Sequence, residues 1–373
     1  MPSEFMTAAL AEAESALGTT SPNPAVGAVV VRDGRIVGRG HTQPPGGAHA
    51  EVMALREAGE AARGATVYVT LEPCSHHGRT PPCVDALLAA GVAEVRYAIG
   101  DPDPQVSGRG DANLRVAGVR VEAGDGAPES TRLLQAYLHH RHTGRPLVIV
   151  KFAVSLDGRI AAGSGDSRWV SGPEARAWAH RERTRLDAIA VGSNTVLVDD
   201  PELTARPEGV IDPHQPLRVV LDSQGRIAPT ARVLRSGGAL LVTTAGSSAA
   251  WRASVVAAGA EVLEVPASSD GRVSLPALLD ALGGRGVLSM LVEGGGTLLG
   301  AFFDQRLVGR LYAVIAPVII GASKAPSAVA GVGAERMRDA PRLRDLTVER
   351  LGEDTLIAGV PVWPDATDEG GDG

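Results

Sequence analysis

The chain has 373 residues, more than one typical hydrophobic core organises and enough for two domains. Its formal net charge of −7 and its aromatic content of 3% disfavour a nucleic-acid binder, which needs a basic patch and stacking aromatic side chains. Two cysteines, an acidic and apolar beginning and no apolar run of about 18 residues argue against a disulfide framework, a signal peptide and a membrane span, so we expect a cytoplasmic protein that acts on small molecules.

The first part of the chain alternates between helix and strand patterns. Residues 3–17 predict a helix with Ser3 as its N-cap, and residues 25–31 and 35–38 predict strands joined by a tight turn at Asp33-Gly34. Further helices are expected at 50–62, 84–90, 113–117 and 129–138, and further strands at 65–71, 94–99 and 119–122. This alternation indicates a sheet that is covered by helices and parallel after the opening hairpin.

A polar segment at 139–146 contains three histidines and ends in turn residues, and we interpret it as a solvated linker rather than a metal site. The domain boundary is placed there, so that residues 1–144 and 145–373 form two α/β domains. The acidic, glycine-rich tail from about residue 365 is expected to be disordered. The clearest strands of the second domain are expected at 147–154, 188–191, 217–221, 239–242, 261–265 and 287–292, with an antiparallel hairpin of 347–350 and 355–358.

Both cysteines and an upstream histidine form a candidate zinc site. A catalytic zinc takes three protein ligands and keeps a fourth position for water, and His49, Cys74 and Cys83 supply three ligands. Glu51 follows His49 by two residues at the start of a predicted helix, so it can move a proton beside the metal without being a ligand. This combination is typical of zinc deaminases.

Other interpretations of these residues stay open. The usual zinc-deaminase signature places two residues between its cysteines, whereas eight separate Cys74 from Cys83, so the intervening segment must loop out. His76 or His77 could replace His49 as the third ligand, which would leave Glu51 without a purpose. Each cysteine, taken alone, could also be a small buried hydrophobic residue.

A glycine run follows the predicted strand at 287–292. The glycines of Glu293-Gly294-Gly295-Gly296 let backbone N–H groups approach a phosphate at the positive end of the next helix. The run departs from the dinucleotide signature G-x-G-x-x-G, because Leu299 occupies the third glycine position. By itself it is also consistent with a tight turn.

The motifs of both halves together resemble those of one family. They are Ser21 to Gly27, His49-Ala50-Glu51, Thr70 to Cys83, Lys151 to Arg159, Ser167-Arg168-Trp169, Thr195 to Pro201 and Glu293 to Gly296. Over about residues 3–360 the chain resembles the bifunctional deaminase-reductases of riboflavin biosynthesis, whose own variant is the long cysteine spacing. The resemblance implies a cytidine-deaminase-like three-layer αβα domain followed by a dihydrofolate-reductase-like α/β domain.

For the first domain, the resemblance implies one zinc per chain and hydrolytic deamination of 2,5-diamino-6-ribosylamino-4(3H)-pyrimidinone 5′-phosphate, with Glu51 as the catalytic residue. The substrate would be held by Asn23, His76 and Arg79, whereas a turn role is equally open for His41. Asp103 stands where the family usually has asparagine, and we expect this difference to affect a turn.

For the second domain, the resemblance implies NADPH-dependent reduction of the ribosyl side chain to ribityl. The residues alone do not separate NADPH from NADH, because Asp222 suits a ribose hydroxyl and Ser223 a 2′-phosphate. Lys151 and Asp157 are candidates for polarising or protonating the opening sugar ring. The implied cofactor contacts are Ala153, Trp169, Thr195, Asp199, Ser223, Gly295, Gly296, Thr297, Leu298, Leu299, Gly300 and Ala301. The implied substrate contacts are Ser167, Arg183, Leu203, Arg206 and Glu293.

Two alternatives make different predictions. A nucleic-acid-editing zinc deaminase fused to an unrelated reductase-like domain would share the zinc site but would need a basic surface. A non-enzymatic regulator built on a degenerate enzyme should have lost Glu51 or a metal ligand, and none is missing. We also expect a homo-oligomer without a nucleic-acid or membrane partner.

Overall fold

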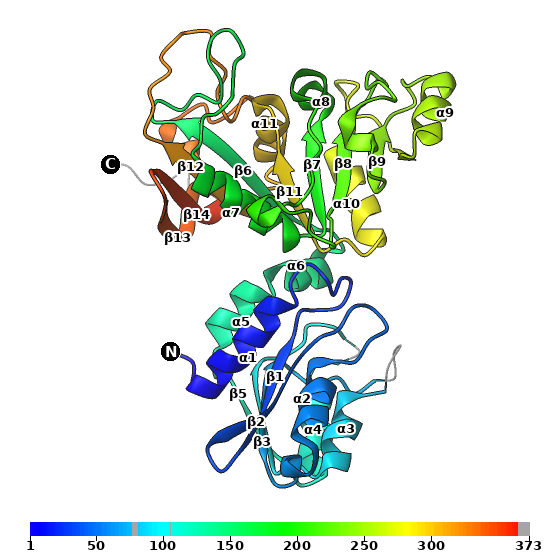
Figure 1. Ribbon diagram of the computed structural model, residues 1–373, viewed down its shortest axis with the longest axis vertical. Coiled ribbons are helices and arrows are strands. Elements are labelled where there is room, and N and C mark those ends of the chain that lie inside the picture. Colours follow the sequence, from blue (N-terminus) through cyan, green and yellow to red (C-terminus); the bar gives the residue numbers. More distant parts are fainter. Residues whose placement is uncertain (77–80, 105, 365–373) are drawn as a thin grey trace. The chain divides into compact units, whose positions relative to one another are not determined.

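The computed structural model describes residues 1–76, 81–104 and 106–364, and the chain divides into two compact units (Figure 1). The first unit comprises Met1–Arg145 and Gly286–Leu288, and the second comprises Pro146–Arg285 and the residues from Ser289 onward. The tail that was expected to be disordered, from residue 365, lies outside the described residues. Within the described part, no helix is long and apolar enough to cross a membrane.

The first unit is built on a five-stranded sheet with the order β2-β1-β3-β4-β5. The strands are β1 (Gly27–Arg32), β2 (Arg35–His41), β3 (Thr66–Leu71), β4 (Glu94–Ile99) and β5 (Arg120–Ala123). β1 pairs antiparallel with β2 and β3, and β3, β4 and β5 are parallel. The predicted tight turn is confirmed, because Asp33 and Gly34 have φ values of 50° and 73°.

Helices cover both faces of this sheet (Figure 1). They are α1 (Glu4–Ser15), α2 (Ala50–Ala58), α3 (Cys83–Ala90), α4 (Arg109–Val116), α5 (Ala127–Leu133) and α6 (Gln135–Thr143), with a 3-10 turn at Gly59–Ala62. Val30 of β1 packs in the cluster of α2 and α3, whereas its neighbour Val29 packs against Met6 of α1. A strand buried on both faces has no polar side, so β1 reads as an unbroken apolar run. The predicted three-layer αβα architecture is confirmed.

Ser3 caps the first helix as predicted. Its Oγ accepts a hydrogen bond from the N–H of Met6 at 3.2 Å, and α1 begins at the next residue, Glu4. Gly40 has a related local role, because a Cβ atom there would lie 2.5 Å from the carbonyl oxygen of Ala50. The absence of a side chain lets the first turn of α2 approach β2 closely.

The interpretation of 139–146 as a solvated linker is wrong over most of its length. α6 continues through Thr143 and ends at Gly144, whose φ of 72° is left-handed. Tyr137 and Arg141 are four residues apart and share one helix face, and the Tyr137 side chain is buried. His139, His140 and His142 also lie on α6, and their polar side chains hide the helix pattern in the sequence. The single helix predicted at 129–138 is two helices, α5 and α6, separated at Leu134.

The second unit contains a nine-stranded sheet with the order β10-β9-β8-β7-β11-β6-β12-β14-β13. Its strands are β6 (Leu147–Ser155), β7 (Ala188–Gly192), β8 (Leu217–Leu221), β9 (Ala239–Thr243), β10 (Glu261–Glu264), β11 (Ser289–Glu293), β12 (Arg310–Ala316), β13 (Arg342–Leu351) and β14 (Asp354–Val362). The final antiparallel hairpin is confirmed and longer than predicted. The sequence analysis missed β12, which pairs parallel with β6 and antiparallel with β14.

The helices of the second unit follow its parallel strands. They are α7 (Pro173–Thr184), α8 (Ser193–Asp199), α9 (Ala249–Ala257), α10 (Leu275–Gly284) and α11 (Gly296–Asp304), with 3-10 turns at Pro207–Gly209, Arg232–Leu234 and Met337–Asp339. β11 lies between β6 and β7, in a register that pairs Glu293 with Lys151. The carboxyl ends of these three strands therefore meet at one edge of the sheet, which is where ligands bind in open parallel sheets. The predicted dihydrofolate-reductase-like α/β fold is confirmed.

Candidate active sites

His49, Cys74 and Cys83 converge in the first unit. His49 Nδ1 lies 3.2 Å from Cys83 Sγ and 3.5 Å from Cys74 Sγ, and the three ligand atoms lie within 4.8 Å of one another. Two thiolates and one imidazole at these separations fit a tetrahedral zinc with one position left for water. Among the described residues, this is the only such group of histidine, cysteine and acidic side chains. His76 is not part of it, and His77 lies outside the described residues.

Each ligand sits at the end of an element. His49 immediately precedes α2, Cys74 follows β3, and Cys83 is the first residue of α3. The Cys83 N–H lies 3.3 Å from Cys74 Sγ, and the Val84 N–H donates to the Cys74 carbonyl oxygen at 3.2 Å. Backbone donors at a helix start favour a thiolate over a thiol. The backbone N–H groups at the beginning of α3 therefore stabilise the Cys74 thiolate, which is the form that binds a metal cation.

Glu51 lies in the first turn of α2, two residues after His49, and its exposed fraction is 4%. Burial, and then the charge of the Cys74 thiolate, raise the pKa of Glu51 to about 7. A carboxyl group with such a pKa can both accept and donate a proton near neutrality. The side chain thus has the placement and the acidity that proton transfer requires.

A cavity of about 280 Å³, which we call the Glu51 cavity, opens beside this cluster. Of the predicted residues it is lined by Asn23, His49, Glu51, Cys74 and His76. The Nδ1 atom of His76 is buried and has no hydrogen-bond partner in the described part of the chain, so it can bind a ligand. Arg79 lies outside the described residues.

Two further residues that the resemblance singled out are His41, a candidate for substrate binding or for a turn, and Asp103, which was expected to affect a turn. The His41 ring lies 3.3 Å from both Glu12 and Ser15 and does not line the Glu51 cavity. Asp103 does line it, and its carboxylate lies 3.7 Å from the Arg141 guanidinium. Asp103 therefore does more than form a turn.

The sequence analysis missed one wall of the Glu51 cavity, formed by Asp101, Asp103, Tyr137 and Arg141. The Tyr137 hydroxyl donates to the Asp101 carboxylate, with oxygen separations of 3.0 and 3.2 Å. The Arg141 guanidinium lies over the Tyr137 ring, 5.0 Å from its centroid. The four-residue spacing of Tyr137 and Arg141 was the available signal, and the linker interpretation concealed it.

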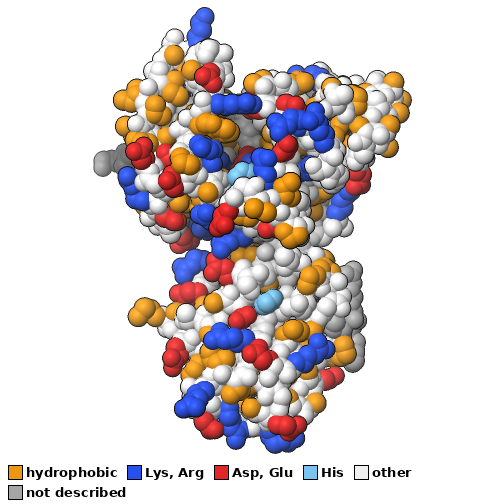
Figure 2. Space-filling model, in the orientation of Figure 1, with side chains coloured by type: hydrophobic (Ala, Val, Ile, Leu, Met, Phe, Trp, Pro, Cys, Tyr) orange, Lys and Arg blue, Asp and Glu red, His pale blue; other side chains and the backbone are white. Residues whose placement is uncertain are grey.

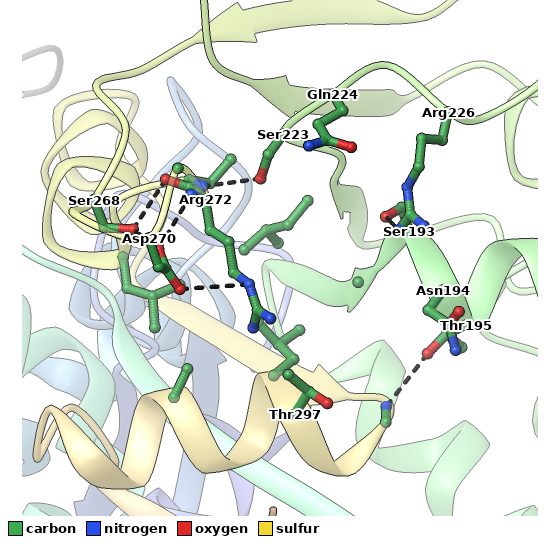
Figure 3. A pocket seen from close by; sticks show the side chains of 18 of the residues that line it. Ser193, Asn194, Thr195, Ser223, Gln224, Arg226, Ser268, Asp270, Arg272 and Thr297 are labelled. Carbon is green, nitrogen blue, oxygen red and sulfur yellow. Dashed lines mark hydrogen bonds and ion pairs between the residues drawn. The ribbon is translucent and has the colours of Figure 1, made fainter. Parts of the chain in front are cut away.

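The second unit holds a cavity of about 560 Å³ in front of α11, which we call the Gly295 cavity (Figure 3). The Gly295 N–H donates to Thr195 Oγ1 at 3.3 Å, and a Cβ atom on Gly295 would meet no atom within 4 Å. The backbone there is open to a ligand at the amino end of the helix. The predicted cofactor residues that line the cavity are Thr195, Ser223, Gly295, Thr297, Leu298 and Ala301.

Other residues of the glycine run face the protein instead. A Cβ atom would lie 2.4 Å from the Ser327 carbonyl oxygen at Gly296, and 2.5 Å from the Ala330 backbone at Gly300. Leu299 is fully buried. Successive residues of a helix point in different directions, so a contiguous run cannot all face one ligand. Gly296, Leu299 and Gly300 therefore do not line the Gly295 cavity, and their predicted contacts with the cofactor stay predictions.

A second cavity of about 660 Å³, the Lys151 cavity, lies at the same sheet edge. In Figure 2, basic and histidine side chains gather around a hollow in the second unit. Ala153 and Trp169, predicted as cofactor contacts, line the Lys151 cavity rather than the Gly295 cavity. The predicted substrate residues that line it are Ser167, Arg183 and Arg206.

Asp199 and Leu203 line neither cavity, and the same holds for Glu293 and for Gly296, Leu299 and Gly300 of the glycine run. Asp199 accepts a hydrogen bond from Arg168 at its backbone oxygen, at 3.1 Å. The Leu203 side chain is buried, although its φ of 55° marks an unusual turn beside Arg206. The predicted ligand contacts of Asp199 and Leu203 stay predictions.

Glu293 forms an ionic group with two cations at the end of β11. Its carboxylate lies 2.5 Å from Arg183 and 3.8 Å from Lys151. Burial opposes the charged form, but the Arg183 and Lys151 cations hold the pKa of Glu293 at about 2. The glutamate therefore stays ionised and orients both cations, which line the cavity, from behind.

Two aspartates considered from the sequence are occupied elsewhere. Asp157 accepts hydrogen bonds from the Ser155 hydroxyl and then from the Ile320 and Gly321 N–H groups, which lower its pKa to about 2. It therefore carries no proton to give near neutrality. Asp222 is fully buried and does not line the Gly295 cavity; its Oδ2 accepts from the backbone N–H groups of Arg226 and Ile227, and its Oδ1 has no partner among the described residues.

His180, also missed, lines the Lys151 cavity. Its Nδ1 accepts the Arg206 N–H at 3.1 Å. Burial, together with the charges of Arg183 and Arg206, lowers the pKa of His180. The ring is therefore held in its neutral form and ties the loop that carries Arg206 to α7.

Comparisons with known proteins bear on both halves. Residues 1–99 match the family model of the cytidine and deoxycytidylate deaminase zinc-binding region, and residues 146–357 match that of the RibD C-terminal domain. The riboflavin biosynthesis protein RibD of Escherichia coli (strain K12) is 42% identical over 364 residues, which cover 95% of this chain and 97% of that protein. RibD of Mycobacterium tuberculosis (strain ATCC 25618 / H37Rv) is also 42% identical, over 358 residues, with 95% and 96% covered.

Comparison with solved structures points to the same family as the sequence comparisons. Acinetobacter baumannii RibD superimposes with a TM-score of 0.85 at 36% identity, and a diaminohydroxyphosphoribosylaminopyrimidine deaminase/5-amino-6-(5-phosphoribosylamino)uracil reductase from Thermotoga maritima with 0.83 at 32%. Each comparison covers 96% of this chain and 98% of the other. Because these relatives span both halves, no fusion to an unrelated domain is needed to explain the second unit. The chain belongs to the RibD family of riboflavin biosynthesis, as a bifunctional enzyme with a zinc-dependent deaminase domain and a reductase domain.

Proposed function

We propose that the chain deaminates 2,5-diamino-6-ribosylamino-4(3H)-pyrimidinone 5′-phosphate and then reduces the ribosyl group of the product to ribityl with NADPH. The observation that carries the first step is the buried Glu51 carboxyl group, which lines the same cavity as His49 and Cys74. The relative from Thermotoga maritima is named for both activities. The substrate is a small molecule, in keeping with the size of the cavities.

In the deaminase site, His49, Cys74 and Cys83 would hold the zinc. When bound, zinc makes a water molecule acidic enough to serve as a nucleophile near neutral pH. Glu51 would accept a proton from the attacking water and return it to the departing amine, which leaves as ammonia. Asn23 and His76 line the cavity beside Glu51 and hold the pyrimidine through hydrogen bonds.

In the reductase site, Gly295 and Thr195 would hold the dinucleotide phosphates at the beginning of α11. NADPH, when bound, supplies the hydride. Arg183 and Arg206 suit the substrate phosphate by charge and by the shape of the guanidinium. Lys151 faces the same cavity beside Glu293 and is the remaining candidate to protonate the opening sugar ring, since Asp157 is ionised and occupied.

A direct test is incubation of the protein with the diaminopyrimidine substrate, with and without NADPH, followed by identification of the products by mass. We expect ammonia and the deaminated pyrimidine without NADPH, and the ribityl compound when NADPH is added. Unchanged substrate in both reactions, from a sample that contains zinc, would contradict the proposal.

We further propose that residues 1–144 act as the deaminase domain and 145–373 as the reductase domain. The two family matches end and begin on either side of this boundary, and the compact units divide close to it. The homo-oligomer and the cytoplasmic location stay predictions from the sequence. Size-exclusion chromatography with light scattering tests the first of these.

A further inference from the structure

His180 of α7 lines the Lys151 cavity together with Lys151, Arg183 and Arg206. These three neighbours are cations, and each has a part in the proposed reduction, either in binding phosphate or in protonating the sugar ring. His180 has no such part, although an imidazole ring is a versatile hydrogen-bonding group. The contacts of its two ring nitrogens show what it can contribute.

The first ring nitrogen, Nδ1, is occupied by the protein. It accepts the backbone N–H of Arg206 at 3.1 Å, so it carries no proton of its own. Burial, and then the charges of Arg183 and Arg206, lower the pKa of His180. Glu293 and the Thr204 carbonyl group act in the opposite direction with smaller effect. The ring is therefore neutral near pH 7, and its single proton lies on Nε2.

The second ring nitrogen, Nε2, is available to a ligand. Among the described residues no side chain accepts from it, and the Thr204 carbonyl oxygen beside the ring already accepts from the Arg183 guanidinium at 2.9 Å. His180 and Arg183 lie three residues apart on one face of α7, and both bind the loop of residues 204–206. These contacts hold the ring in place, so the cavity has a neutral N–H donor beside its guanidinium groups.

A neutral donor suits an uncharged oxygen, because the phosphate has stronger partners in the two guanidinium groups. In the substrate, the hydroxyl groups of the ribosyl group lie between the 5′-phosphate and the carbon that is reduced. His180 shares its cavity with Arg206 and with Lys151, the residues proposed for those two ends. We propose that the Nε2–H group of His180 donates to a hydroxyl oxygen of the ribosyl group and holds the sugar for reduction, an inference that rests on the proposed reductase function.

Two substitutions separate the roles of the two nitrogens. The amide oxygen of asparagine can replace Nδ1 as the acceptor of the Arg206 N–H, whereas the amide nitrogen of glutamine can replace Nε2 as the donor to the sugar. His180→Asn should raise the KM for the deaminated pyrimidine by roughly five- to tenfold, the loss of one uncharged hydrogen bond, with kcat largely kept.

His180→Gln should raise this KM by less than about threefold, because the donor is retained. The loop that carries Arg206 also stays anchored in this variant. The Gln215 side chain accepts the Ala205 N–H at 2.8 Å and donates to the Ala205 carbonyl oxygen at 2.9 Å.

The assays use the full chain, the deaminated pyrimidine and saturating NADPH. The Kd for NADPH, the deaminase activity and the melting temperature should match the wild type in both variants, which shows that each variant is folded. His214→Asn is the matched control, because His214 lines neither cavity of the second unit, and it should behave like the wild type.

The two variants distinguish a ligand contact from a purely structural role. A raised KM in His180→Asn, with His180→Gln close to the wild type, supports the inference. The reverse order overturns it, because His180 would then only hold the loop of Arg206, and so do equal KM values in the two variants. If the wild type reduces no deaminated pyrimidine with NADPH, the proposed reductase function itself fails, and the inference fails with it.

Discussion

The two sites of this chain are assembled in different ways. In the deaminase site the metal-binding side chains and Glu51 lie between residues 49 and 83 and meet beside one cavity of about 280 Å³. In the reductase site the predicted residues extend from Ala153 to Ala301, and those that line a cavity are divided between two, of about 560 and 660 Å³.

The difference has a chemical reason. Zinc binding and proton transfer require particular side-chain atoms, so few residue types can occupy those positions. A dinucleotide is held largely by backbone N–H groups and by shape, which many sequences can provide. The deaminase site should therefore respond to single side-chain changes far more strongly than the reductase site.

The largest effect is expected for Cys83→Ser. A serine hydroxyl is a poor zinc ligand, so the variant should lose most of its metal and its deaminase activity should fall to background, with reductase activity largely intact. Metal analysis and the two separate assays measure this. Full zinc occupancy in the variant would instead indicate that His76 or His77 completes the site.

Glu51→Gln should come next. Glutamine matches the size of the buried carboxyl group but cannot transfer protons, so kcat for deamination should fall by about 10²–10⁴-fold while zinc is retained. Glu60→Gln, on the exposed turn after the same helix, is the control and should behave like the wild type. Activity within threefold of the wild type would remove Glu51 from its catalytic role.

Gly295→Val probes the reductase site with a smaller expected effect. A Cβ atom there meets no protein atom within 4 Å, and the φ of −65° suits any residue, so we expect the change to act on the ligand. We expect the KM for NADPH to rise by about tenfold, the loss of roughly one charge-assisted hydrogen bond, with deamination unchanged. Unaltered NADPH kinetics would mean that the cofactor lies elsewhere.

The neighbouring Gly296→Ala is the structural counterpart. Its Cβ atom would overlap the Ser327 carbonyl oxygen, so we expect a loss of stability of about 1–3 kcal/mol, measured by thermal or denaturant unfolding. Comparison of the Gly295→Val and Gly296→Ala variants distinguishes a glycine that faces the ligand from one that packs against the protein. Equal stability of the two variants would contradict this division.

Tyr137→Phe tests the part of the deaminase site that the sequence analysis missed. The change removes the hydrogen bond to the buried Asp101 carboxylate and should lower the stability of the first unit by about 1–2 kcal/mol. We expect only a several-fold loss of deaminase activity, because the zinc ligands and Glu51 remain. A loss as large as that of Glu51→Gln would give Tyr137 a direct role in the reaction.

Most of the fold could be predicted because its signals are local. The apolar runs predicted the five strands of the first unit, and Asp33-Gly34 and Ser3 predicted their turn and cap. The sequence analysis missed β12 and interpreted α6 as a linker. A helix with few apolar residues, such as α6, is hard to recognise from sequence, because only the face that packs against the protein distinguishes it from a polar loop. That packing depends on residues distant in the sequence.

By itself, the sequence predicted the zinc ligands, a candidate proton-transfer residue and the family, because these depend on residue type and short spacing. Only the tertiary structure decided which residues of the glycine run face a cavity. It also decided that backbone N–H groups occupy the Asp157 carboxylate and that Asp222 is buried away from the Gly295 cavity. The direction of a side chain and the partners it finds depend on strand order and helix packing, and neither is encoded within a single short motif.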